Sequence, residues 1–217
     1  MKFNQKLKKF FKPILLFVGS LWYYIWKDDS WKGWLFSVAF LFVFIKFVFF
    51  PLLSLTTGTA LPLAIVESCS MYHEGNLFSS YDTWWEKHET KYETFGVTKE
   101  DFEKFPFTKG LNKGDVLFVT GADTKKLKIG DVIIFEAGKQ NPLIHRIIKI
   151  TEDSSGQKIY ETIGDNNNGQ LSIEKNVQET QIIGKATAKP APYLGWGKLI
   201  FFEFSRNPES RGFCNEN

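Results

Sequence analysis

The stretch Gly130–Phe135 reads GDVIIF and follows a near copy, Gly114–Val119, which reads GDVLFV. Gly-Asp is a turn signal, and an apolar run rich in β-branched residues directly after it predicts a strand. We interpret the two stretches as two strand entries of one sheet, not as an internal repeat, with each aspartate capping its turn. The pattern predicts a mainly β domain.

Short apolar runs of the same kind lie on both sides of these stretches. Turn residues separate them, as expected for a sheet of short strands. The predicted strands cover residues 63–66, 116–119, 132–135, 144–150, 158–163 and 182–186.

A charged and aromatic segment, residues 72–109, interrupts this β pattern. Within it, residues 98–103 read TKEDFE and predict the start of a helix with Thr98 as its cap. We expect a short helical insertion between two strand regions. Its Trp84 and Trp85 are expected to cover a functional site, dip into a membrane surface or pack on the β domain.

An apolar stretch of 23 residues, 33–55, reads GWLFSVAFLFVFIKFVFFPLLSL. It is long enough to cross a hydrocarbon core of about 30 Å, so we predict a transmembrane helix over residues 33–57. Its single charge, Lys46, costs roughly 2.5–3.5 kcal/mol on insertion scales and can snorkel toward one interface. An earlier stretch, residues 13–26, is short for a span and is bordered by lysines and aromatics. It predicts a helix lying in the interface, with a second crossing as the alternative.

The distribution of lysines predicts the orientation. Seven lysines precede the apolar stretch, and after Lys46 the next basic residue is Lys87. The positive-inside rule then places the N-terminus in the cytoplasm, provided that residues 13–26 do not cross. The expected organisation is a basic, aromatic interfacial segment (1–32), a single-pass transmembrane helix (33–57), an extracytoplasmic β domain (58–204) and a polar tail (205–217).

The bulk composition excludes some classes of function. A chain of 217 residues can hold one domain and an anchor, and a net charge of +3 is too small to indicate nucleic-acid binding. No His/Cys/Glu cluster has the spacing of metal ligands, so neither a metal nor another cofactor is expected. The two cysteines, Cys69 and Cys214, lie far apart in the sequence, and we interpret both as unpaired.

The chemistry-bearing residues follow in the order serine, histidine, aspartate. Ser70 lies in Glu67–Met71 (ESCSM), directly after a predicted strand. His145 lies inside a strong β run, where a strand fixes the side chain as a general base requires. Asp165 lies in a run of turn residues and can orient an imidazole. These residues predict a serine peptidase with Ser70 as nucleophile and His145 as base, and His73 is a competing base.

Three motifs carry a resemblance to type I signal peptidases of the archaeal and endoplasmic-reticulum form. Their Ser-Gly-Ser-Met-x-Pro box resembles Ser68–His73, in which Cys replaces Gly and His replaces Pro. His145-Arg146 stands where bacterial members have Lys-Arg. The Gly-Asp-Asn-Asn box is present at Gly164–Asn167. The resemblance covers roughly residues 40 to 200 without the insertion.

The resemblance implies a fold and a function. It implies a signal-peptidase-like β domain at the plasma membrane that cleaves signal peptides from exported preproteins. The preprotein signal peptide and the lipid bilayer are then partners, with the secretion translocon as a further candidate. Ser68 would lend its hydroxyl to the oxyanion hole. The substrate would lie extended along walls formed by Ala64, Ile65, Val66, Pro142, Leu143 and Ile144, which favour small residues in an A-x-A site.

One position departs from the family pattern. The archaeal and reticulum enzymes usually carry a second aspartate six residues after the first, and here that position is Leu171. The third member is therefore Asp165, or Glu174 after a local shift, or absent in a Ser-His dyad. Two alternative functions stay open: a dedicated processing peptidase with few substrates, and a catalytically inactive, membrane-anchored binding module of the same fold.

Overall fold

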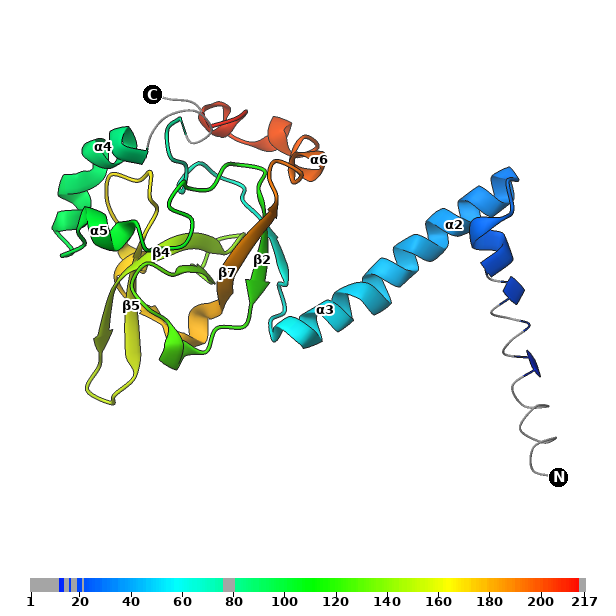
Figure 1. Ribbon diagram of the computed structural model, residues 1–217, viewed down its shortest axis with the longest axis horizontal. Helices are drawn as coiled ribbons and strands as arrows, with labels where there is room; N and C mark the ends of the chain where they lie inside the picture. The colour runs from blue at the N-terminus through cyan, green and yellow to red at the C-terminus, as the bar shows by residue number, and fades with distance from the viewer. Residues whose placement is uncertain (1–11, 14–15, 17–18, 21, 76–80, 215–217) are drawn as a thin grey trace. The chain divides into compact units, whose positions relative to one another are not determined.

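The computed structural model describes residues 12–13, 16, 19–20, 22–75 and 81–214. The chain divides into two compact units, Met1–Leu55 and Thr56–Asn217. The described residues of the first unit are mostly helical, and the second unit is built on a β-sheet (Figure 1).

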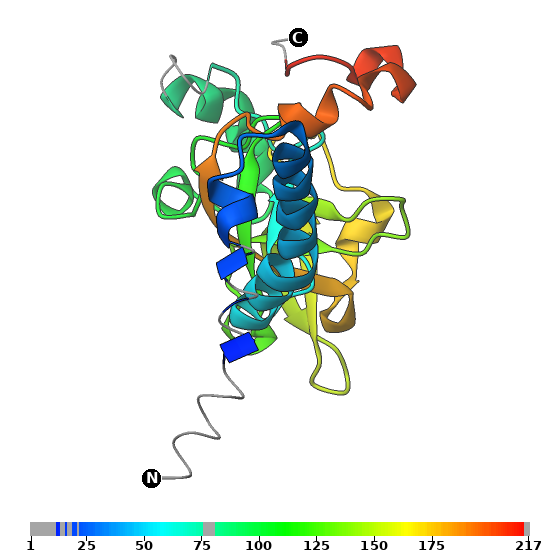
Figure 2. The same ribbon diagram turned by 90° about the vertical axis from the view of Figure 1, so that its right-hand side faces the viewer.

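A long apolar helix dominates the first unit (Figure 2). It consists of α2 (Trp31–Phe44), one π-helical turn (Ile45–Phe49) that contains Lys46, and α3 (Phe50–Thr57). Ser30 caps its N-terminus, because the Ser30 side chain accepts a hydrogen bond from the Gly33 N–H at 3.1 Å. Its 27 residues span about 40 Å at 1.5 Å per residue, so the helix is long and apolar enough to cross a membrane.

The expected interfacial segment, residues 13–26, lies in part outside the described residues. Residues 22–26 are helical, and the Ser37 hydroxyl of α2 donates to the backbone carbonyls of Tyr24 and Ile25 at 3.3 and 3.2 Å.

In the described part of the second unit, seven strands form one curled antiparallel sheet in the order β1-β2-β7-β3-β4-β5-β6. The predicted mainly β fold is confirmed, and each of the six predicted strands is present. The seventh, β6, has two residues, too few to produce a readable pattern. The strands are β1 (Leu63–Ile65), β2 (Val116–Thr120), β3 (Val132–Phe135), β4 (Leu143–Glu152), β5 (Lys158–Ile163), β6 (Val177–Gln178) and β7 (Ile182–Ala191).

The two Gly-Asp turns lead into the strands on either side of β7. Gly114 and Gly130 both have φ +94°, a conformation that favours glycine. Asp115 and Asp131 each accept a backbone N–H three residues upstream, at 2.8 and 3.0 Å, so both cap their turns as predicted. Each also pairs with a lysine of β7, which ties the two strand entries to the same central strand.

The segment at residues 72–109 contains α4 (Tyr81–Glu93) and α5 (Lys99–Phe102). Thr98 caps α5, as predicted, and its hydroxyl accepts from the Asp101 N–H at 3.2 Å. Trp84 and Trp85 are each only 2% exposed and pack in an aromatic cluster against the sheet. The reading in which these tryptophans dip into a membrane surface is therefore wrong.

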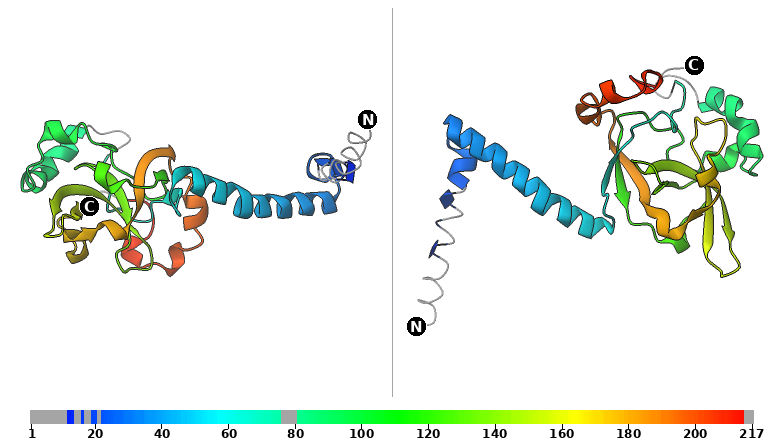
Figure 3. Two further views of the ribbon diagram at one scale, coloured as in Figure 1. Left: turned by 90° about the horizontal axis from the view of Figure 1, so that it is seen from below. Right: turned by 180° about the vertical axis from the view of Figure 1, so that it is seen from behind.

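The C-terminal residues 196–214 form a short helix, α6 (Trp196–Leu199), and two 3₁₀ turns. They lie at the same end of the sheet as α4 but on the opposite side, and the β4–β5 hairpin projects from the other end (Figure 3). Residues 205–214 of the expected polar tail are mostly exposed, and they are attached to the β domain through Arg206 and through Cys214.

We expect Gly130→Ala to destabilise the β domain. A Cβ there would lie 2.2 Å from the Phe105 ring, and the positive φ is unfavourable for alanine. The two effects together should lower the free energy of unfolding by about 2–4 kcal/mol. Thermal unfolding in detergent measures the loss. Gly169→Ala, where a Cβ meets nothing within 4 Å, is the matched control, and equal losses in the two variants would contradict this account.

Candidate active site

The Ser70 loop, Glu67–Met71, follows β1 at the edge of the sheet. Backbone hydrogen bonds fix both of its ends: Val66 N–H donates to the Asp115 carbonyl at 2.9 Å, and Leu111 N–H donates to the Met71 carbonyl at 2.7 Å. A tight turn, closed by the hydrogen bond from Tyr72 N–H to the Cys69 carbonyl at 3.1 Å, presents Ser70. The serine therefore sits on a short loop that is held at each end.

The side chains of Ser70 and His145 meet directly. The Oγ of Ser70 lies 2.9 Å from Nε2 of His145 and 3.1 Å from Oγ of Ser68. His145 belongs to β4, which is paired on both edges, and is 2% exposed. A strand with neighbours on both sides holds the imidazole in one orientation, so the expected juxtaposition of serine and histidine is present.

Glu174 occupies the position behind His145. Its Oε1 forms a hydrogen bond with Nδ1 of His145 and also accepts one from the Thr162 hydroxyl at 3.3 Å. Its Oε2 accepts the backbone N–H of Leu171 at 2.7 Å, at the start of a 3₁₀ turn, Ser172–Lys175. Glu174 is fully buried, so the carboxylate is fixed by three partners in line with the imidazole and the serine.

Asp165, expected as the partner of the histidine, is engaged elsewhere. Its carboxylate accepts two hydrogen bonds from Arg146, Nε to Oδ1 at 2.9 Å and Nη2 to Oδ2 at 2.7 Å. Successive residues of a strand point to opposite faces, so Arg146 and His145 project from opposite sides of β4. Asp165 binds Arg146 on that side of β4. It therefore does not orient His145, contrary to the expectation from the sequence.

The arginine–aspartate pair is the centre of a buried network. The remaining guanidinium N–H groups donate to the backbone carbonyls of Pro106, Gly130 and Phe107. The Tyr92 hydroxyl from α4 donates to Asp165 at 2.8 Å. Burial opposes ionisation of Asp165, but the Arg146 charge and the hydrogen bonds outweigh it and hold the pKa of Asp165 well below its usual range.

His73, the competing base, belongs to this network. Its Nε2 lies 2.9 Å from Oδ2 of Asp165, and its ring stacks on Trp84 with centroids 3.6 Å apart. Burial lowers the pKa of His73, although the Asp165 carboxylate opposes that shift. Nearby, burial lowers the pKa of Lys91 to about 8 while its ammonium donates to the Asp165 and Asn167 carbonyls. His73 is thus committed to Asp165, away from Ser70.

A groove leads to Ser70, with a cavity volume of about 460 Å³. The six residues expected as substrate walls all line it: Ala64, Ile65, Val66, Pro142, Leu143 and Ile144. Met71 and Ile134 add apolar surface. At one end the groove becomes polar, where Glu67, Lys198 and Arg206 line it. The two basic residues of this end had no signal in the sequence analysis.

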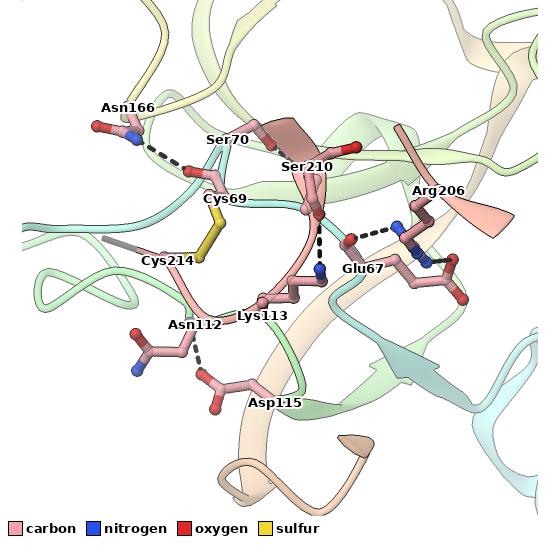
Figure 4. Close-up of a disulfide and its surroundings, with 12 residues drawn as sticks. Glu67, Cys69, Ser70, Asn112, Lys113, Asp115, Asn166, Arg206, Ser210 and Cys214 are labelled. Atoms are coloured by element: carbon pink, nitrogen blue, oxygen red, sulfur yellow. Dashed lines mark hydrogen bonds and ion pairs between the residues drawn. A yellow bond between two sulfur atoms is a disulfide. The ribbon is translucent and has the colours of Figure 1, made fainter. Parts of the chain in front are cut away.

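Cys69 and Cys214 form a disulfide with Cα atoms 5.5 Å apart (Figure 4). The interpretation of both cysteines as unpaired is therefore wrong. Their separation of 145 residues concealed the pairing, because the fold brings the C-terminal residues back to the Ser70 loop. The even number of cysteines was a signal that pointed to pairing.

We expect Asp165→Asn to unfold the domain more readily. It leaves the buried Arg146 without its counter-charge, which costs about 3–5 kcal/mol when one partner of a buried pair is removed. Thermal unfolding in detergent measures the effect. Asp82→Asn is the matched control, because Asp82 pairs with Lys99 at the surface, where such pairs contribute about 0–1 kcal/mol. An Asp165 variant as stable as the Asp82 variant would contradict a structural role for the pair.

No protein-family model matches the chain. The chain is 29% identical over 106 residues to the human signal peptidase complex catalytic subunit SEC11C, an alignment that covers 44% of this chain and 53% of the human protein. It is 38% identical over 58 residues to the signal peptidase complex catalytic subunit SEC11 of Eremothecium gossypii, covering 26% and 34%. The chain spans about half the length of SEC11C. Its homologues are thus SEC11 catalytic subunits of signal peptidase complexes, matched at low identity over part of the chain.

Proposed function

We propose that this chain is a membrane-anchored serine endopeptidase that cleaves signal peptides from exported preproteins. The observation that carries the proposal is the 2.9 Å contact between Ser70 Oγ and His145 Nε2, with the Glu174 carboxylate on the other ring nitrogen. The similarity to signal peptidase catalytic subunits supports the substrate class.

The chemistry follows from this row of side chains. His145 takes the proton of the Ser70 hydroxyl as its oxygen attacks the scissile carbonyl carbon, and the tetrahedral oxyanion forms. The imidazolium then returns the proton to the leaving amine, which leaves an acyl-enzyme on Ser70. A water molecule, deprotonated by the same histidine, hydrolyses the ester and regenerates the serine.

Glu174 is the third member in this proposal. Its carboxylate keeps the Nδ1 proton of His145 in place, so that Nε2 faces Ser70, and it stabilises the imidazolium that forms during the reaction. The enzyme therefore belongs to a Ser-His subtype with a glutamate partner. Asp165 serves the fold through Arg146 and takes no part in the proton transfers.

Ser68 is proposed as an oxyanion donor beside the Ser70 N–H. Its hydroxyl lies 3.1 Å from the nucleophilic oxygen, close to where the oxyanion would develop. The preprotein would lie extended in the groove and add a strand to β1, an edge strand of the sheet. Ala64, Val66 and Ile144 line the groove on its apolar side and would favour small residues at the A-x-A positions.

The proposed topology has residues 33–57 as the anchor and the β domain outside the cytoplasm, at the plasma membrane. The lysine-rich N-terminal region supports this orientation by the positive-inside rule. The Cys69–Cys214 disulfide supports it independently, because disulfides persist in oxidising compartments.

The central test uses the purified full chain in detergent with a preprotein that carries an A-x-A site. We expect wild-type protein to cleave it at that site, and Ser70→Ala and His145→Ala to lose detectable cleavage, because each removes a group that exchanges a proton or forms the ester. Ser154→Ala, at an exposed position in the turn between β4 and β5, is the control for the serine substitution. A wild-type protein that leaves every preprotein intact would favour the inactive binding module instead.

A second test identifies the third member. We expect Glu174→Gln to lower kcat by on the order of 10⁴-fold, as replacing the carboxylate of a Ser-His-Asp triad by its amide does. Glu152→Gln, on the exposed end of β4, should retain wild-type kcat. If Glu174→Gln cleaves at the wild-type rate, Ser70 and His145 act as a dyad.

A further inference from the structure

The two residues that flank Ser68 are both held by the C-terminal strap, residues 203–214. On one side, Arg206 binds Glu67 twice, with Nη1 2.8 Å from the Glu67 carbonyl oxygen and Nη2 2.9 Å from Oε2. On the other side, Cys69 is covalently joined to Cys214. Figure 4 shows these two attachments on the same short stretch of chain that carries Ser70.

The strap is itself anchored to the β domain. Lys113, which is 1% exposed, donates from Nζ to Oε2 of Glu203 at 2.9 Å and to the Ser210 carbonyl at 2.8 Å. Near the C-terminal end of the strap, the Gly212 N–H also donates to Oε2 of Glu203, at 2.7 Å. Because Lys113 lies just before β2, its contacts join the strap to the sheet.

A second support for the loop is the turn Gly164–Asn167, which follows β5. Asn166 donates from its backbone N–H to the Ser70 carbonyl at 2.8 Å and from its side chain to the Cys69 carbonyl at 3.1 Å. The loop is thus held between two supports. The Asn166 support holds the Ser70 side of the loop, and the strap holds Glu67 and Cys69 on either side of Ser68.

We propose that the C-terminal strap is a positioning element for the nucleophile, with Arg206 and Cys214 as its positioning residues, and that reduction of the disulfide weakens catalysis by releasing the loop. This inference rests on the proposed function. Neither residue touches the reacting atoms; both act through Glu67 and Cys69. A displacement of about 1 Å in such a site can cost on the order of 10²-fold in rate, so a modest loosening is measurable.

The experiment uses the full chain in detergent and two readouts: kcat and KM on an A-x-A preprotein, and hydrogen exchange of the backbone amides of residues 66–71 and 132–135. We expect Cys214→Ala to lower kcat roughly 10- to 100-fold with little change in KM. At short labelling times, residues 66–71 should take up more deuterium while β3 stays protected, because the loop opens locally whereas β3 exchanges only through global unfolding.

Reduction provides the reversible version of the same change. Dithiothreitol supplies two electrons and two protons, converts the disulfide to two thiols and is itself oxidised to a cyclic disulfide. Reduced wild type should match Cys214→Ala and recover on reoxidation, whereas Cys214→Ala should not respond to the reagent. A response of the variant equal to that of wild type would overturn the assignment to this disulfide.

Arg206→Gln tests the non-covalent attachment with the disulfide intact, and we expect a lower kcat and faster exchange in residues 66–71. Lys126→Gln is its control, because Lys126 also pairs with a carboxylate, that of Asp123, but lies at the surface and outside the strap, so it should keep the wild-type kcat. A wild-type kcat in both Arg206→Gln and Cys214→Ala would overturn the proposal. So would deuterium uptake in β3 as early as in the loop, which would show that the changes open the whole domain and not the loop.

The two readouts separate this inference from the proposed function. A wild-type protein that cleaves no preprotein refutes the peptidase function, while loop exchange still reports whether the strap positions Ser70. Cleavage by wild type with unchanged loop exchange in Cys214→Ala retains the peptidase and refutes the strap.

Discussion

The bidentate ion pair between Arg146 and Asp165 is the constraint on which the arrangement of the site depends. It is fully buried and receives the hydroxyl of Tyr92 and the ring nitrogen of His73 from the segment between β1 and β2. Arg146 projects from the side of β4 opposite to His145. Asp165 neutralises its charge there, and this pairing fixes the position of the next residue, Asn166. The turn that carries Asn166 supports the Ser70 loop. One side of β4 thus carries Arg146, which holds the supporting turn in place, and the other side carries the His145 imidazole that contacts Ser70.

The helices α4 and α5 of the insertion support the buried Arg146–Asp165 pair. α4 supplies Tyr92 and Lys91 to the Asp165 turn, and its tryptophans close the apolar side of the same network. The insertion is therefore part of the scaffold behind the site. Burying an arginine and an aspartate together is costly unless their hydrogen bonds are satisfied, and the insertion provides a share of those bonds.

Period-2 patterns and turn signals are local, and they were sufficient for the strands, as length and apolar composition were for the long helix. The groove walls and the pairing of Ser70 with His145 were instead expected from the resemblance to signal peptidases, because no local pattern brings together residues 75 positions apart. The sequence left Glu174 as one of three alternatives for the third member, because the approach of Glu174 to His145 depends on a short 3₁₀ turn after β5 with no periodic signature. The partner of Asp165 was predictable in part: strand alternation sends Arg146 to the face opposite His145, and a buried arginine requires a carboxylate. The Cys69–Cys214 pairing depends on a return of the chain over 145 residues, which no local pattern encodes.

The same disulfide also acts on the unfolded chain. It encloses β2 to β7, six of the seven strands described, in one covalent loop. In the chain-entropy treatment, closing a loop of 145 residues lowers the conformational entropy of the denatured ensemble enough to favour the folded state by about 5 kcal/mol. A protein that reached a reducing compartment would lose this bias across the whole sheet, so its redox surroundings would govern its lifetime as a folded domain.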